Sequence, residues 1–157
     1  MGRSTWIISI ILVVMGGLLA VVHWVLPGMI ERSMNVVEAH APYSIGQETL
    51  AFHDELFIAD LHADTLLWKR DMLQASDRGH VDLPRLGEGN VALQFFAAVT
   101  KSPSGQNYEA NTADSDNITA LAVAQLWPPR TWSSLFERAM YQAEKLERDA
   151  ARADGGL

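Results

Sequence analysis

The longest apolar run of the sequence lies near its N-terminus. Residues 6–26 read WIISIILVVMGGLLAVVHWVL and contain no formally charged side chain. About 20 apolar residues are enough for a helix to cross a bilayer, and Trp6 and Trp24 lie near the two ends, where interfacial aromatic residues gather. A cleaved signal peptide is the alternative, but its apolar core usually has only about 7 to 15 residues. The pattern therefore favours an uncleaved transmembrane helix over residues 6–26.

The segment after this run is shorter and more polar. Apolar residues at helical spacing predict an amphipathic helix over residues 29–40, and Pro42 ends it. We interpret residues 27–47 as a membrane-proximal stalk. Arg3 and the α-amine precede the span, so the tendency of basic residues to stay inside favours a cytoplasmic N-terminus with the remainder outside, periplasmic or extracellular.

Two further apolar runs predict β-strands. Phe57 to Leu61 is short, and Val91 to Thr100 (VALQFFAAVT) is nearly continuous. A continuous run of this kind is typical of a strand that is buried on both faces of a parallel sheet. Gln94 is the one polar residue inside the second run, so it needs a hydrogen-bond partner if it is buried.

His62 and Asp64 follow the first predicted strand. Side chains alternate along a strand, so these two residues are expected to point to the same side, about 7 Å apart. An imidazole nitrogen and a carboxylate oxygen suit zinc and similar divalent ions. The pattern is short and also occurs by chance, so a structural or surface role is the alternative on spacing alone. His80 and Asp82 repeat it, but Asp82 is better explained as a helix cap.

Helices are predicted from capping patterns. Asp82, with Pro84 close behind, is typical of a helix start. Asn117 begins a helix leading to Trp127, after a long polar loop over residues 101–116. Ser134 and Glu137 form a capping-box pattern ahead of a helix over residues 134–150, whose apolar stripe is expected to cover a core.

Composition narrows the classes of function. The formal net charge is −7 and the estimated pI is about 5.1, so the chain has no broad basic face for nucleic acid. It has no cysteine, which excludes disulfides, thiolate zinc sites and a cysteine nucleophile. The 48% hydrophobic and 20% charged residues are typical of a globular protein.

These motifs, in this order, carry a family resemblance. The strand ending in His62-x-Asp64, the residue Trp68, the run HVDLPRL over residues 80–86 and the run QFFAAVT over residues 94–100 resemble the N-terminal part of the membrane dipeptidases, the renal-type zinc dipeptidase family. The resemblance extends from about Glu48 to the end of the chain. It implies a (β/α)₈ TIM barrel with two zinc ions at the C-terminal ends of its strands, dipeptide hydrolysis by a metal-activated water, and a homodimer in the complete enzyme.

The resemblance also assigns roles to individual residues. In that family the His-x-Asp of the first strand supplies ligands to one of the two metals, and those positions match His62 and Asp64. Many relatives have Asn between these ligands and Leu-Pro after them, whereas Ala63 and Thr65-Leu66 occupy those places here. The difference suggests a bacterial-type branch and leaves the dipeptide preference open.

Length limits what this chain is expected to do. A TIM barrel needs about 250 residues, and about 100 follow Phe57. We therefore expect an α/β protein in which a transmembrane helix precedes the first strands and helices of an incomplete barrel. The expected layout is a cytoplasmic N-terminus (1–5), a transmembrane helix (6–26), a stalk (27–47) and the N-terminal portion of the dipeptidase barrel (48–157). We expect weak or absent zinc binding and no peptidase activity from such a fragment; no catalytic residue is assigned, and the substrate-binding residues are unknown.

Two other readings of the sequence stay open. One is a non-catalytic, membrane-anchored interaction module whose apolar strands and amphipathic helix dock onto a partner. The other is a non-peptidase hydrolase on a related metal barrel, which opens a lactone or an amide ring.

Overall fold

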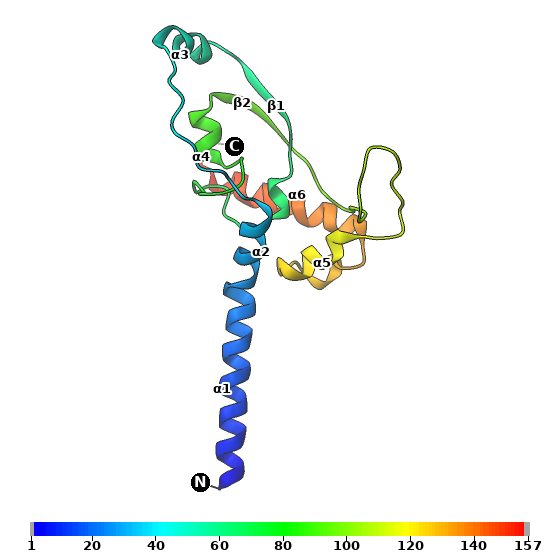
Figure 1. The fold of residues 1–157 in the computed structure, drawn as a ribbon. Coiled ribbons are helices and arrows are strands. Elements are labelled where there is room, and N and C mark those ends of the chain that lie inside the picture. The colour runs from blue at the N-terminus through cyan, green and yellow to red at the C-terminus, as the bar shows by residue number, and fades with distance from the viewer. Residues whose placement is uncertain (1, 156–157) are drawn as a thin grey trace.

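The structure is a computed structural model that describes residues 2–155. It contains six α-helices, two strands and two short 3₁₀ helices within that range (Figure 1). The α-helices are α1 (Arg3–Trp24), α2 (Leu26–Met34), α3 (Gln47–Asp54), α4 (Leu83–Glu88), α5 (Asn117–Ala124) and α6 (Leu135–Arg152); the strands are β1 (Ile58–Ala63) and β2 (Val91–Phe96); the 3₁₀ helices are η1 (Thr65–Leu67) and η2 (Pro129–Thr131).

Helix α1 projects away from the rest of the molecule, and α2 continues it with a small break at Val25 (Figure 1). The apolar helical segment Thr5–Met34 is long enough to cross a membrane, and none of its most apolar stretch is buried against other parts of the structure. A signal sequence near the N-terminus has the same properties. The structure thus supports an N-terminal membrane-type helix and leaves its orientation open.

The predicted helix over residues 29–40 is wrong at its C-terminal end, because α2 ends at Met34. The Asn35 side chain donates a hydrogen bond to the carbonyl of Glu31 (3.1 Å), an interaction with which Asn side chains compete with helical backbone pairing. Residues 36–46 carry no regular structure and are exposed, so no packed face holds them in a helix.

Helix α2 packs against the domain through a buried charge. The Glu31 side chain is only 2% exposed, and its two oxygens lie 3.1 Å from Arg70 Nε and 3.1 Å from Arg78 Nη2. One turn earlier, Gln125 Nε2 donates a hydrogen bond to the carbonyl of Pro27 (3.1 Å). The base of α2 is therefore held both by the loop that follows β1 and by the end of α5.

The two strands pair in parallel. Ile58 lies opposite Val91, Asp60 opposite Gln94, and Ala63 opposite Phe96. Gln94 finds the partner that its position demands, because its Nε2 donates to Asp60 Oδ2 (2.8 Å). The second strand is shorter than predicted: Ala97 still donates to the carbonyl of Ala63, but beyond that point β1 no longer offers backbone groups in register.

The expectation that β2 is buried on both faces is wrong. Leu61 on β1 and Leu93 and Phe95 on β2 are 73%, 43% and 51% exposed. Helices α4 and α6 lie near β2 on one side only, where Leu86, Leu146 and neighbouring residues line a shared cavity with the strand. The described residues thus form a small mixed helix and strand domain around an open two-stranded sheet, and they do not close a TIM barrel.

The core lies beneath η1 and α5. It consists of Leu67, Trp68, Ile118, Leu121, Ala122 and Trp127, with Ile30 of α2 and Tyr141 of α6 packed against it. The predicted caps of α4 and α6 are confirmed: Asp82 accepts a hydrogen bond from the amide of Arg85, and Ser134 accepts one from the amide of Glu137. The start of α5 at Asn117 is also confirmed, with Asp116 as its cap.

Helix α6 is amphipathic, but its buried face is not the predicted one. Leu135, Phe136 and Met140 of the apolar stripe are exposed, whereas Arg138, Gln142 and Asp149 are buried. Arg138 explains this orientation, because its guanidinium donates to the carbonyls of Thr100, Thr131 and Trp132, to Asp116 and to Thr119. A buried guanidinium must keep its hydrogen-bond partners, because a buried charge without them is strongly destabilising; the position of Arg138 therefore fixes which face of α6 is buried.

Candidate functional site

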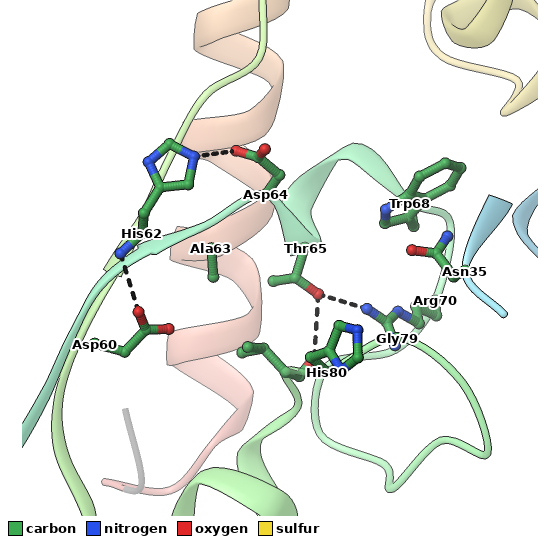
Figure 2. A pocket seen from close by; sticks show the side chains of 11 residues that line it. Asn35, Asp60, His62, Ala63, Asp64, Thr65, Trp68, Arg70, Gly79 and His80 are labelled. Carbon is green, nitrogen blue, oxygen red and sulfur yellow. Dashed lines mark hydrogen bonds and ion pairs between the residues drawn. The ribbon is translucent and has the colours of Figure 1, made fainter. Parts of the chain in front are cut away.

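His62 and Asp64 lie together at the end of β1. His62 Nε2 is 3.0 Å from Asp64 Oδ1, and the two side chains are 70% and 47% exposed. Figure 2 shows the imidazole and the carboxylate facing each other above the strand end. The structure therefore brings the two predicted residues into one accessible pair, as their spacing indicates.

Local backbone structure holds this pair in place. Ala63, between them, is buried, and its carbonyl accepts a hydrogen bond from the amide of Ala97 (2.9 Å), which ties the end of β1 to the end of β2. The chain then turns into η1, where Asp64 is the N-cap residue and the carbonyl of Asp64 accepts from the amide of Leu67. The pair thus lies on the C-terminal edge of a parallel sheet, where loops of α/β proteins commonly form ligand sites.

A cavity of about 300 Å³ opens beside the pair. Its walls combine the end of β1 with the loop after it and the end of α2 (Figure 2). The polar residues that line it are Asn35, Asp60, His62, Asp64, Thr65, Arg70 and His80. Its volume is near the lower end of the range that small-molecule sites occupy, about 300 to 1,000 Å³.

Asp60 gives the cavity a fixed negative charge. The hydrogen bond from Gln94 lowers the pKa of Asp60 below its ordinary value, and the hydrogen bond from the amide of His62 (3.1 Å) lowers it further. Because both donors favour the ionised form, Asp60 carries its charge at neutral pH. The carboxylates of Asp60 and Asp64 therefore make this cavity suited to a cation.

The opposite wall depends on an ordered loop. Thr65 Oγ1 donates to the carbonyl of Val81 (3.1 Å) and accepts from Arg70 Nη2 (2.9 Å), while Arg70 Nη1 donates to the carbonyl of Arg78 (2.7 Å). Gly79 adopts a positive φ of 64° within this loop, and a side chain there would collide with the guanidinium of Arg70. Arg70 therefore connects the cavity wall to Glu31 of α2.

The His62 and Asp64 pair fits two ligands of a divalent metal, but it does not complete a site. Ligand atoms about 2.1 Å from a tetrahedral zinc ion lie about 3.4 Å apart, and the observed separation of 3.0 Å needs only a small opening. Within residues 2–155, no group of three or more His, Cys, Asp or Glu side chains is arranged to hold a metal ion. Catalytic zinc needs about three protein ligands and an open position, so no catalytic step follows from the described residues alone.

The structure also adds residues that the sequence analysis missed. Asp60 is one of them: the register of β1 is irregular between Asp60 and Ala63, so simple strand alternation did not indicate that Asp60 lines the cavity. His80 lines the cavity, whereas Asp82 turns away from it and caps α4, so the second His-x-Asp pattern does not form a second pair. No local pattern indicated Arg70 or Asn35, because their positions depend on the packing of α2 against the loop.

The chain was compared with known proteins in three ways. No family model, no curated protein and no solved structure matches it.

Proposed function

We propose that this chain is the membrane-anchored N-terminal portion of a zinc-dependent dipeptidase and supplies the first two metal ligands of its active site. The proposal assigns metal binding to His62 and Asp64 and the remaining ligands to strands that follow in the complete barrel. In that enzyme a metal-activated water adds across the peptide C–N bond and yields a carboxylic acid and an amine.

One observation carries this proposal. His62 Nε2 and Asp64 Oδ1 are accessible, 3.0 Å apart, and placed at the C-terminal end of the first of two parallel strands. This is the edge at which TIM-barrel enzymes place their catalytic residues. The cavity beside the pair also contains the carboxylate of Asp60, while the guanidinium that lines it, that of Arg70, is already paired with Glu31.

Zinc titration of the 157-residue chain in lipid nanodiscs tests the proposal directly. We expect one weak zinc site per chain, measured by calorimetry, and the double variant His62→Ala with Asp64→Ala to lose it. Even partners of metal ligands change affinity by about 10- to 100-fold when they are mutated, so loss of both ligands is expected to abolish measurable binding.

A matched control comes from the same protein. His53 and Asp54 form another exposed pair, 3.8 Å apart, on α3 and away from the cavity. The double variant His53→Ala with Asp54→Ala should bind zinc as the parent chain does. Equal loss of zinc in both double variants, or full retention in the His62 and Asp64 variant, refutes the assignment.

A non-catalytic, membrane-anchored module is a second candidate, favoured by one specific feature. Leu61 and Phe95 on the sheet and Phe136 on α6 are exposed apolar side chains, as expected of surfaces that dock onto a partner.

A non-peptidase hydrolase that opens amide or lactone rings uses the same metal ligands. A panel of dipeptides, cyclic amides and lactones, tested with zinc on the complete protein, separates the two hydrolases. The absence of any zinc site in that complete protein favours the module.

A further inference from the structure

An apolar groove of about 490 Å³ lies between α2 and α5. Ile30 and Met34 of α2 form one wall, and Ile118, Leu121 and Ala124 of α5 form the other. Leu67 and Val99, from the segments that follow the two strands, complete the groove. Its size is in the range of small-molecule sites, and its lining is mostly aliphatic.

The groove shares one lining residue with the candidate metal site. Asp64 lines both the apolar groove and the polar cavity that contains Asp60, His62 and His80. The two spaces are therefore neighbours on either side of Asp64. A ligand that fills both has a polar group at Asp64 and an apolar group that extends along α2 and α5.

The groove also lies next to the end of the apolar helix. Ile30 is four residues beyond Leu26, the end of the uncharged run, which corresponds to about 6 Å along a helix. The headgroup layer of a bilayer is about 5 to 8 Å deep on each side. Gln125 holds the end of α5 at the level of Pro27, and Lys69 Nζ lies 3.4 Å from the carbonyl of His23 in the last turn of α1. With α1 in a membrane, the mouth of the groove is at headgroup depth.

We propose that this groove binds the apolar tail of an amphipathic amide substrate, such as an N-acylated dipeptide. The peptide group between the two amino acids of that substrate then lies at His62 and Asp64. This inference rests on the proposed function and names its substrate class. The tail enters from the bilayer interface along α2, because that is the side on which the apolar helix and the groove adjoin. The aliphatic lining binds the tail by excluding water, and the polar cavity receives the peptide group.

Photocrosslinking of the full chain in phosphatidylcholine nanodiscs tests the inference. The probe is N-dodecanoyl-glycylglycine with a diazirine at the end of its acyl chain, applied in the presence of zinc. We expect labelling on α2 and α5 along the groove. The variant Ala120→Phe, an exposed groove residue, should reduce this labelling about fivefold or more by filling the space. Val123→Phe, on the same helix but outside the groove, should leave it unchanged.

A second probe, a dodecanol with the same diazirine, distinguishes a substrate from a membrane lipid. Stronger labelling of the groove by the dipeptide probe supports the inference. Equal labelling by both probes shows that the groove holds bilayer acyl chains and overturns it, as does labelling that Ala120→Phe does not reduce. Intrinsic tryptophan fluorescence, to which the buried Trp68 and Trp127 contribute, verifies that both variants fold. The zinc titration described above tests the two metal ligands separately from the groove. A chain that binds zinc but is not labelled along the groove contradicts this inference alone, and a chain that does not bind zinc contradicts the proposed function.

Discussion

Asp82 illustrates how one buried carboxylate organises a segment of this chain. Its side chain is 1% exposed and accepts hydrogen bonds from the amides of Ser76 and Arg85 and from Arg85 Nε. Burial by itself raises the pKa of Asp82, but the hydrogen bonds from Arg85 and Ser76 outweigh it and lower the pKa below its ordinary value. The ionised carboxylate therefore stabilises both the start of α4 and the loop that forms the cavity wall.

We expect Asp82→Ala to lower the free energy of unfolding by about 2 to 4 kcal/mol, because it removes a helix cap and leaves Arg85 without its carboxylate. Urea unfolding in detergent micelles, followed by tryptophan fluorescence, measures the change. Asp77→Ala is the matched control in the same loop, since Asp77 is 74% exposed in its pair with Arg78. That variant should lie within about 0.5 kcal/mol of the parent chain. Equal effects of the two substitutions contradict this account of Asp82.

We expect the buried Lys145 to make the free energy of unfolding depend on pH. Its Nζ contacts the carbonyls of Leu66 and Trp68, and burial lowers its pKa from 10.5 to about 8, against an opposing effect of Asp149. The unfolded chain therefore binds more protons than the folded chain between pH 8 and 10.5. Stability rises with pH in this window, because the cost of burying the charge is present in full below pH 8 and disappears as the amine loses its proton.

Between pH 8 and 9, the loss of the Lys145 proton raises the free energy of unfolding by about 1 kcal/mol. Chemical unfolding at the two pH values should show the gain in the parent chain and its loss in Lys145→Met. Lys101→Met is the control, because Lys101 is exposed and its Nζ donates a hydrogen bond to the carbonyl of Ala113 at the surface. Burial raises the pKa of Tyr141 above 10.0, so the measurement stays below pH 10. A parent chain that loses stability from pH 8 to 9 contradicts the prediction.

At the scale of elements, Glu31 determines how the membrane-type helix is attached. Loss of the Glu31 charge leaves Arg70 without a carboxylate partner and leaves Arg78 with only its exposed partner Asp77, and breaking a buried ion pair in this way typically costs about 3 to 5 kcal/mol. We expect Glu31→Gln to release α2 from Arg70 and Arg78 and to increase hydrogen exchange in α2 and in the loop over residues 69–79. Glu38→Gln, at an exposed position beyond α2, should leave exchange unchanged. Unaltered exchange in Glu31→Gln means that α2 is held by other contacts.

The elements that the sequence predicted best are those with local signals. The apolar run of α1, the caps at Asp82 and Ser134, and the two strand cores all follow from residues close together in the chain. The His62 and Asp64 pair belongs to the same class, because alternation along one strand is enough to predict it. Its use as a metal site stays a prediction.

The elements predicted worst depend on distant partners. The orientation of α6 follows from Arg138, whose acceptors lie between 6 and 38 residues away along the chain. Hydrophobic periodicity favoured Phe136 and Met140 instead. The cavity wall follows from the contact between Glu31 and Arg70, which no local pattern indicates. Long-range pairing of buried charges is therefore the information that single-sequence reasoning lacked.

At the scale of the whole molecule, the described residues leave apolar surface uncovered outside the membrane-type helix, and two such places lie on regular elements. One is the sheet, where Leu61 and Phe95 are exposed, and the other is the stripe of α6 with Phe136. Residues of α4 and α6 line a cavity with β2, whereas Leu61 and Phe95 of the same sheet are exposed; α4 and α6 are seen near the two strands in Figure 1. Exposed apolar strands with free edges favour association with further polypeptide.

Because the sheet is open on one face, substitutions on that face should change the association of the chain without changing its free energy of unfolding. Leu61→Asp combined with Phe95→Asp should change the free energy of unfolding by no more than about 0.5 kcal/mol, because both side chains are exposed in the described structure. The same variant should remain monomeric in micelles at concentrations at which the parent chain associates, as measured by light scattering after size exclusion. Leu66→Ala is the contrasting control: Leu66 is 3% exposed, and its truncation should cost about 2 to 5 kcal/mol without changing association. If the double variant unfolds as readily as Leu66→Ala, the outer sheet face is covered within this chain, and the open sheet is not the state that the protein adopts in solution.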